Sequence, residues 1–553
     1  MINAYSKINE IFLTIFVLQF IILESTSLLF NNKSNFIVFN NLKKINLSFF
    51  NFKSKYNINK SGIFISSKFQ SLKSLELISY GILQGIIFSF FLEFFENEFL
   101  SLLDLFLLFY FFISFLILYT VRNSNDKINN LRFYTFLAIT ILAGYEFLLS
   151  FNGNLIHTFC SLELLSFLIY LFIGLHTQYE TDLNILTVDM GLKAYLYGCV
   201  FSGLFIFGAS LIYFVYGTLS YNEIFFLNLY QSLDSLNLDV FSLFEKLSTF
   251  GFLCILITFF YKMGFLPFHT MAVDLYGIMA FGPLLILVTL FKFLYLVAIF
   301  FFMSLLSASS FITISKIVYL IAFLNIIFVS LLTYGQEKIK RFFLYMSLIP
   351  TVTILLFFVL PTVSSIVNGI LFIFFYIIHT FLLWTLFLFI SNNYTFTNIF
   401  NRSYSHLANS WYFRQIFISD FTGFIKSHPV LGGIIVYIMF NFSGLPILLF
   451  FFLKVSLVES FISLSYANYA FIYLSISILP LAYYLRFIKI VAFETKTESA
   501  YPKLFEKDDI DRVFKTKQNE SLALCISFLF IFSILSVLYG EFFSYIIEYT
   551  LLK

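Results

Sequence analysis

Long apolar stretches recur along the whole of this 553-residue sequence, and they restrict its fold more than any other feature. A helix needs about 20 predominantly apolar residues to cross a bilayer, and it satisfies every backbone N–H and C=O within the hydrocarbon. We therefore expect an all-α polytopic membrane protein with about fourteen transmembrane helices. The expected spans lie near residues 11–30, 77–95, 101–120, 133–151, 155–176, 190–216, 247–275, 278–303, 311–333, 342–361, 366–391, 431–462, 467–492 and 521–548.

The charges between these spans predict the orientation of the chain in the membrane. Only 11% of the residues are charged, and a net charge of +3 gives no reason to expect nucleic-acid binding. Loops after odd-numbered spans hold most of the Lys and Arg: residues 31–75 contain many Lys and no acidic residue, whereas residues 218–244 contain acidic residues and no basic one. Because Lys and Arg are enriched in cytoplasmic or matrix loops, the loop at 31–75 is predicted to face that side and both termini the other.

Two lysines interrupt the apolar sequence of the seventh and eighth spans. Lys262 and Lys292 fall near the middles of these spans. A charge at the centre of a membrane helix costs roughly 2.5 to 3.5 kcal/mol, so such a residue faces a partner or a water-filled path rather than lipid. Pro267 removes a backbone donor shortly after Lys262, which predicts a broken seventh helix beside the lysine. Broken helices at membrane depth line polar cavities, so the pattern indicates a conduction path.

The twelfth span repeats this combination, because Lys454 follows Pro446 within it. Corresponding interrupted helices in two halves of a chain are typical of transporters built from inverted repeats. We therefore expect two inverted five-helix repeats, with broken seventh and twelfth helices. The expected parts are 1–132 with the first three helices and the basic loop, 133–303 and 304–495 with the two repeats, and 496–553 with a polar loop and the last helix.

Further ionisable residues lie inside other spans. Glu163 has apolar sequence on both sides within the fifth span, which favours a functional charge over a helix-end glutamate. Lys193 lies near the start of the sixth span, where it either takes part in function or reaches the interface with its own stem. We expect Glu163 and Lys262 to form a switchable ion pair, because two isolated buried charges of opposite sign cost less together than apart.

Two histidines leave alternatives open. His379, in the eleventh span, either relays protons, since its unperturbed pKa is about 6.5, or is a hydrogen-bonded core residue. His269 follows Pro267 and either joins the relay or caps the helix break.

Redox and nucleotide chemistry are not expected in this chain. Its cysteines stand singly, without metal-ligand spacing, and no glycine-rich phosphate-binding motif is present. Proton transfer between lysines and a glutamate is the chemistry that remains, because burial and neighbouring charges bring such groups into a range where they load and release protons.

The spacing of these residues resembles the antiporter-like subunits of respiratory NADH:ubiquinone oxidoreductase (complex I). The family's K-x-x-x-x-P-F-H block, with its following aspartate, tyrosine and lysine, is matched by Lys262, Pro267, Phe268, His269, Asp274, Tyr276 and Lys292. Further matches are Glu163 with Leu164, Leu165 and Ser166; Lys193 after Gly191 and Leu192; Gln336, Ile339, Lys340, Arg341 and Tyr345; Phe442, Ser443, Gly444, Leu445 and Pro446 with Lys454; and Tyr483, Tyr484, Leu485, Arg486 and Lys489. The resemblance runs from Gly153 to Phe493, and the Asp-Leu-Tyr at 274–276 favours the subunit 2 group.

This resemblance implies a core membrane-arm subunit that translocates protons, driven by NADH oxidation and ubiquinone reduction in other subunits. The implied proton-translocating residues are Glu163, Lys262, Lys292 and Lys454, with Lys193, His269 and His379 as further candidates. No cofactor or metal is implied for this chain; NADH, FMN, iron–sulfur clusters and ubiquinone are expected elsewhere in the complex. The implied partners are other membrane-arm subunits and lipid, cardiolipin among them.

The implied location is the mitochondrial inner membrane. The 84 Phe and 35 Tyr are what an A+T-rich gene encodes, which is typical of an organellar genome or a low-GC bacterium.

The chain also departs from the family pattern. Met271 and Val273 replace a Trp and a Pro, Phe450 replaces a frequent Gly, and Pro350 stands where a His is usual, which argues against a relay role there. Two other functions remain open: a subunit of a multi-subunit cation/proton antiporter, and a membrane scaffold that does not conduct.

Overall fold

The computed structural model describes most of the chain after residue 100. The described residues are 101–122, 131–175, 181–231, 238–279, 281–393, 417–446, 448–494, 518–538 and 540–551. The first two expected spans, the basic loop at 31–75 and nearly all of the polar segment at 495–519 lie outside them.

The chain divides into two compact units. One comprises Met1–Leu100 with Asn130–Ala138, and the other comprises Ser101–Asn129 with Ile139–Lys553. Of the first unit, only the start of one helix is described, so the account below is of the second. The predicted division into inverted repeats remains a prediction.

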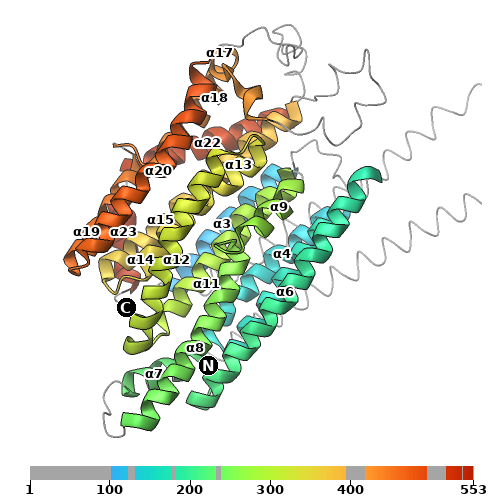
Figure 1. Cartoon of the computed structure of the whole chain (residues 1–553). Coiled ribbons are helices and arrows are strands. Elements are labelled where there is room, and N and C mark those ends of the chain that lie inside the picture. The colour runs from blue at the N-terminus through green and yellow to red at the C-terminus, as the bar shows by residue number, and fades with distance from the viewer. Residues whose placement is uncertain are drawn as a thin grey trace, which may run out of the picture. The chain divides into compact units, whose positions relative to one another are not determined.

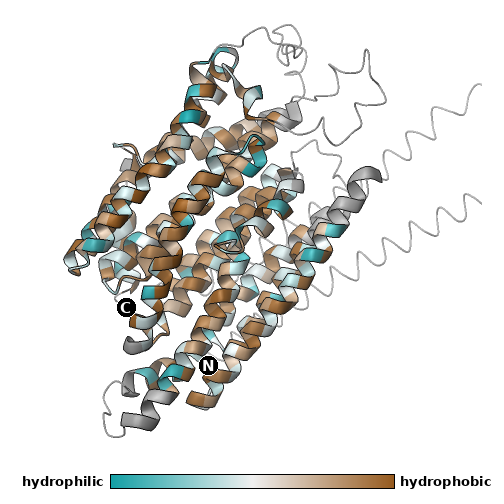
Figure 2. Cartoon of the chain, in the orientation of Figure 1, coloured by the Kyte–Doolittle hydropathy of each residue, from teal (hydrophilic) through white to brown (hydrophobic). Residues whose placement is uncertain are grey.

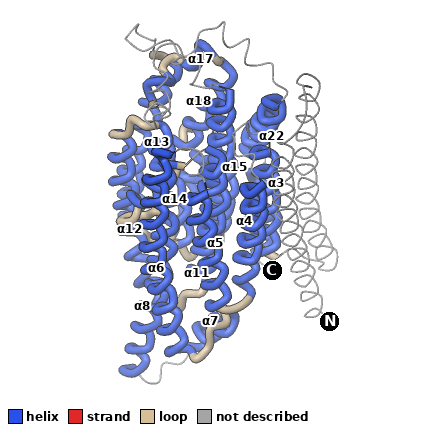
Figure 3. Tube along the Cα trace, turned by 90° about the vertical axis from the view of Figure 1, so that its right-hand side faces the viewer, coloured by secondary structure: helices blue, strands red, loops and turns tan. Residues whose placement is uncertain are grey.

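Helices make up the regular structure of the described residues, as the tube in Figure 3 shows. In chain order they are α3 (Leu102–Arg122), α4 (Leu131–Leu149), η1 (Ser150–Asn152), α5 (Leu155–Leu175), α6 (Thr181–Tyr216), α7 (Tyr221–Gln231), α8 (Leu238–Met263), α9 (His269–Ile278), α10 (Phe281–Ile286), the π-helical η3 (Leu287–Phe291), α11 (Lys292–Ser304), α12 (Ala308–Tyr334), α13 (Ile339–Met346), α14 (Leu348–Phe358), α15 (Val363–Asn393), η5 (Ile418–Phe421), α17 (Phe424–Ser427), α18 (Pro429–Ser443), α19 (Leu449–Ser463), α20 (Ala467–Ala492), α22 (Gln518–Leu538) and α23 (Gly540–Leu551). The expected all-α class is confirmed.

Seven helices within the described residues are long and apolar enough to cross a membrane. Two bent helix pairs raise this number to nine if each pair is one span. One of them, Leu522–Ser536 with Gly540–Leu551, bends by 78°, so the last expected span is not one straight helix. Brown apolar residues cover most of the ribbon in Figure 2. A multi-pass membrane protein is therefore confirmed, while the count of fourteen helices stays a prediction.

The larger unit has spans that are almost fully buried at its centre and spans that are mostly exposed at its edges. Three spans, Phe281–Ser304, Ile339–Phe358 and Val363–Ile390, each have 94% of their most apolar stretch buried. Asp189–Tyr216 and Ala467–Ala492 have only 33% buried. Figure 1 shows these two helices, α6 and α20, toward opposite edges of the unit. The centre is where an isolated charge needs partners from the protein.

Local sequence explains where several helices begin. Ser307 precedes α12 and its hydroxyl accepts a hydrogen bond from the Ser310 backbone N–H at 3.3 Å, which satisfies one free donor of the first turn. Pro429 opens α18, where its missing N–H costs no helical hydrogen bond.

The segment expected as a plain acidic loop at 218–244 contains a helix, α7. Its Asn228 is buried, accepts a hydrogen bond from the Tyr216 hydroxyl at 2.5 Å and donates to the Leu305 carbonyl at 2.7 Å. These two bonds tie the loop to the ends of α6 and α11. Tyr216 and Leu305 are 12 and 77 residues away from Asn228 in the sequence, so the apolar pattern could not predict either contact.

Candidate functional site

The seventh expected span is broken beside its lysine. Lys262 is the second-last residue of α8, and α9 starts only at His269. Inside the break, the Leu266 N–H donates to Asn325 Oδ1 of α12 at 2.9 Å, so a backbone donor that has left the helix is satisfied. The predicted break is confirmed, and it places Lys262 at a helix end rather than at a helix centre.

Glu163 and Lys262 are near each other but not in contact. Glu163 lies on α5 and is half-buried, and its Oε1 is buried with no hydrogen-bond partner among the described residues. Lys262 likewise makes no hydrogen bond or ion pair with a described residue, although the charge of Glu163 acts on it. The structure therefore has no closed ion pair here; the switchable pair stays a prediction.

Lys292 is held in the buried centre by hydroxyl groups. The residue is 4% exposed. The ammonium donates to Ser347 Oγ at 2.7 Å and to Tyr376 Oη at 3.5 Å. Each of the three residues comes from a different one of the three most buried spans. A π-helical stretch, Leu287–Phe291, directly precedes Lys292.

The Lys454 side chain spans the second helix break, between α18 and α19. Its ammonium reaches back from α19 to the end of α18 and donates to the carbonyls of Phe442 and Ser443, at 3.2 Å and 2.9 Å. The last carbonyls of a helix lack helical partners and carry negative partial charge, so a cation is stabilised there. The predicted break of the twelfth span is confirmed as the gap between α18 and α19.

The lower-ranked candidates have local partners. Lys193 forms an ion pair with Asp189 at 2.8 Å, one turn earlier on α6, and both side chains are about half exposed. His379 is buried; its Nδ1 lies 2.7 Å from the Phe375 carbonyl and its Nε2 has no partner among the described residues. His269 starts α9, and its Nδ1 is also buried without a described partner. Roles for these residues stay predictions.

Basic residues gather where α13 begins. Arg341 forms an ion pair with Asp274 of α9 at 2.9 Å, and Lys340 donates to the Met279 carbonyl at 2.7 Å while lying 4.4 Å from the centre of the Phe281 ring. Burial, and next the charge of Arg341, lower the pKa of Lys338. This end of α13 therefore fixes the segment that follows the first helix break.

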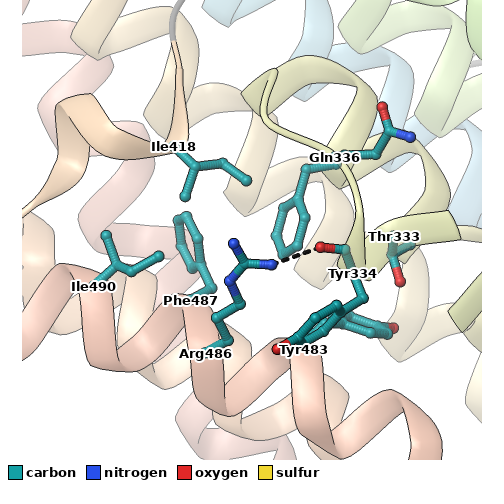
Figure 4. Close-up of a pocket in the computed structure, with 9 residues that line it drawn as sticks. Thr333, Tyr334, Gln336, Ile418, Tyr483, Arg486, Phe487 and Ile490 are labelled. Atoms are coloured by element: carbon teal, nitrogen blue, oxygen red, sulfur yellow. Dashed lines mark hydrogen bonds between the residues drawn. The ribbon is translucent and has the colours of Figure 1, made fainter. Parts of the chain in front are cut away.

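A small pocket lies near this basic end. It is lined by Thr333, Tyr334, Gln336, Phe342, Ile418, Tyr483, Arg486, Phe487 and Ile490. Arg486 Nη1 donates to the Tyr334 carbonyl at 2.6 Å, as Figure 4 shows, and thus caps the end of α12. With a volume of about 10 Å³ the pocket has room for no more than about one water, so it is not a substrate cavity.

Sequence reasoning found the ionisable residues but missed the groups that hold them. Ser347, Tyr376, Asp189 and the carbonyls at the end of α18 were not anticipated. Only Asp189 had a readable signal, because a carboxylate four residues before a lysine lies on the same helix face. Within the described residues, no cluster of three or more His, Cys, Asp or Glu is arranged to hold a metal.

The sequence also matches a known protein family. Residues 152–479 match the family described as NADH:quinone oxidoreductase/Mrp antiporter, transmembrane. This chain belongs to the NADH:quinone oxidoreductase/Mrp antiporter family. The expected resemblance is confirmed at this level, and the matched range contains the five charged candidates, Glu163, Lys193, Lys262, Lys292 and Lys454, whose roles stay predictions.

Individual members of the antiporter family are distant in sequence. NADH-ubiquinone oxidoreductase chain 2 of Rhizopus oryzae is 24% identical over 73% of this chain and 72% of that protein. NADH-quinone oxidoreductase subunit N of Flavobacterium psychrophilum is 23% identical over 67% of this chain and 73% of that protein.

Solved structures share the fold. A chain of respiratory complex I from Thermus thermophilus superposes with a TM-score of 0.58 at 15% identity, covering 86% of this chain and 97% of that chain. A chain of the Mrp complex from Dietzia gives a TM-score of 0.62 at 14% identity, covering 81% of this chain and 83% of that chain.

Proposed function

We propose that this chain is a proton-translocating membrane subunit of an NADH:quinone oxidoreductase. The observation that carries the proposal is Lys292, an amine enclosed in an apolar core with two hydroxyl partners and no carboxylate bonded to it among the described residues. A lysine without a fixed counter-ion is free to exchange its proton, whereas a structural lysine is normally paired. Glu163, Lys262 and Lys454 supply further charges along the route.

The names of relatives support the proposal that oxidation of NADH by a quinone, in other subunits, drives the proton transport. Curated relatives from Rhizopus oryzae, Flavobacterium psychrophilum and Marchantia polymorpha are named as chain 2 or subunit N of NADH-ubiquinone or NADH-quinone oxidoreductases. In this proposal, NADH, FMN, iron–sulfur clusters and ubiquinone are bound by other subunits, and this chain moves protons only. Its partners are other membrane-arm subunits and lipid, with cardiolipin in the mitochondrial case.

The proposed architecture has fourteen helices in two inverted repeats. Supporting it, the two breaks share a glycine with positive φ, Gly264 and Gly444, followed by a proline. Each break also has a lysine nearby, Lys262 before the first and Lys454 after the second. The repeats are proposed at 133–303 and 304–495. We propose a mitochondrial inner membrane, which is supported by the two relatives named NADH-ubiquinone oxidoreductase chain 2, and an organellar gene, which is supported by the 84 Phe and 35 Tyr of an A+T-rich coding sequence.

Two other functions fit the same family. A subunit of a cation/proton antiporter would share the fold, as the Mrp likeness indicates, and a scaffold would keep the fold without conduction. Native gels separate the antiporter from the proposed complex: comigration of the chain with NADH-oxidising activity supports the proposed complex, and migration in an assembly without that activity supports the antiporter.

Replacement of Lys292 tests the conduction itself. Lys292→Ala is expected to leave assembly intact and to lower proton transport per NADH oxidised in reconstituted vesicles, because the exchangeable proton is lost. Lys316→Ala is the control, since this lysine lies exposed on α12. Full transport in Lys292→Ala would contradict the proposal, and would favour the scaffold.

A further inference from the structure

The ammonium of Lys292 faces two hydroxyl oxygens, and each of these hydroxyls already donates its hydrogen to a backbone carbonyl. Ser347 Oγ donates its hydrogen to the Leu344 carbonyl at 2.6 Å, and Tyr376 Oη donates its hydrogen to the Ser347 carbonyl at 2.9 Å. A hydroxyl has a single hydrogen and two acceptor positions. Both oxygens can therefore only accept from Lys292, at 2.7 Å and 3.5 Å.

This arrangement fits one protonation state of Lys292 and not the other. A protonated amine has donors only and matches two acceptors. A neutral amine has a lone pair that requires a donor, and neither hydroxyl presents its hydrogen to it. Because Lys292 is buried, water does not readily supply the missing donor, and an unsatisfied buried lone pair is costly.

The position of Ser347 makes its hydroxyl the movable part. Ser347 lies at the turn between α13 and α14, where its backbone N–H bonds to the Phe343 carbonyl. Its hydroxyl turns about a single bond, whereas the Tyr376 ring is fully buried and its hydroxyl holds the turn from α15. Rotation of one hydroxyl hydrogen changes the Ser347 side chain from an acceptor into a donor without moving a helix.

We propose that Ser347 is a positioning residue that sets the protonation of Lys292. With the proton on Lys292, the Ser347 hydroxyl donates to the Leu344 carbonyl and accepts from the ammonium. When the proton leaves Nζ for the next carrier, the Ser347 hydrogen turns to the lone pair of the amine, and Ser347 itself neither gains nor loses a proton. This inference rests on the proposed role of Lys292 as a proton carrier.

Chemical labelling of Lys292 in the assembled complex tests the proposal. Acetic anhydride reacts with neutral amines only, and mass spectrometry of the peptide reports how much Lys292 is neutral. In Ser347→Ala both bonds are lost, and because the bond to the ammonium is the stronger of the two, labelling at a fixed pH is expected to rise by up to about tenfold. Ser347→Thr keeps the hydroxyl and should label like the parent.

Matched variants separate this role from packing. Thr351→Ala removes a buried hydroxyl whose one bond among the described residues is to the nearby Leu348 carbonyl, and should not change the labelling. If Ser347→Ala fails to assemble, Ser347→Cys replaces it, since a thiol of similar size is a weak hydrogen-bonding group. Equal labelling in parent and Ser347→Ala overturns the proposal, and so does equal elevation in Ser347→Thr.

The pH profile of proton transport gives the second readout. Ser347→Ala is expected to displace the profile, and Ser347→Thr to restore it, which a merely structural defect would not do. If Ser347→Ala raises Lys292 labelling but leaves transport unchanged at every pH, the positioning role stands, and the proposed role of Lys292 in translocation falls.

Discussion

At the scale of single residues, Gly444 shows how tightly the second break encloses its lysine. The residue has a φ of +74°, and a Cβ added there would lie 2.7 Å from Lys454 Nζ. The missing side chain therefore leaves the room in which the ammonium reaches the end of α18.

Gly444→Ala is expected to impair assembly and proton transport. The left-handed backbone costs a residue with a Cβ roughly 1 to 2 kcal/mol, and the methyl group displaces the ammonium from both carbonyls. Transport and complex yield in membranes measure the effect. Gly433→Ala within α18 is the control, because nothing lies within 4 Å of its added Cβ. Equal behaviour of the two variants would contradict the prediction.

Glu163→Gln is expected to lower proton transport at normal assembly. The change is nearly isosteric, so it removes the charge that acts on Lys262 and little else. Transport per NADH oxidised is the measurement, with Glu223→Gln on the exposed face of α7 as the matched control. Parental transport in Glu163→Gln would exclude this glutamate from the route.

At the scale of elements, α13 holds the segment between the two lysine-bearing helices through two unequal contacts. The Arg341–Asp274 pair is about two-fifths exposed on each side, and exposed pairs contribute less than about 1 kcal/mol. Lys340 is half-buried and combines a charged hydrogen bond with a contact to the Phe281 ring.

Lys340→Ala is therefore expected to destabilise the protein more than Arg341→Ala. A hydrogen bond from a charged group contributes about 1.5 to 3 kcal/mol, against less than about 1 kcal/mol for the exposed pair. Thermal denaturation of the purified complex, with protease cleavage within 264–280 as the readout of unfolding, ranks the two variants. A larger effect of Arg341→Ala would show that the ion pair is the main contact.

At the scale of the whole molecule, the described charges predict a membrane orientation. Lys338 precedes α13 and Lys340 and Arg341 lie in its first turn. These residues and Lys426 on α17 lie toward one end of the larger unit, whereas acidic Glu223 lies on α7 toward the other (Figure 1). The basic end should face the matrix or cytoplasm.

Single cysteines test this orientation, in a background with the exposed Cys160 and Cys199 changed to serine. In intact inner-membrane preparations whose outer face is accessible, an impermeant maleimide should label Glu223→Cys and not Lys426→Cys. Inverted vesicles should give the opposite result, which serves as the control. Labelling of Lys426→Cys from the outer face would reverse the topology.

The sequence predicted those parts of the molecule that depend on neighbours along the chain. Apolar length predicted the membrane-length helices found within the described residues, and Pro267 predicted the break beside Lys262, because a missing N–H acts within one turn. The partners of Lys292 could not be predicted, since Ser347 and Tyr376 lie 55 and 84 residues away and only packing brings them together. The Lys454 contacts could not be predicted for another reason: they are made to backbone carbonyls, which every residue has.

The π-helical stretch before Lys292 affects how this chain tolerates insertion and deletion. A π-turn accommodates one residue more than an α-turn, so losing one residue between Leu287 and Phe291 can restore an α-helix while both flanks keep their facing. The same loss within α11 would rotate everything beyond it by about 100°. Within the span that carries Lys292, length variation among related genes should therefore be confined to this stretch, and a one-codon gap there leaves the lysine opposite the same hydroxyls.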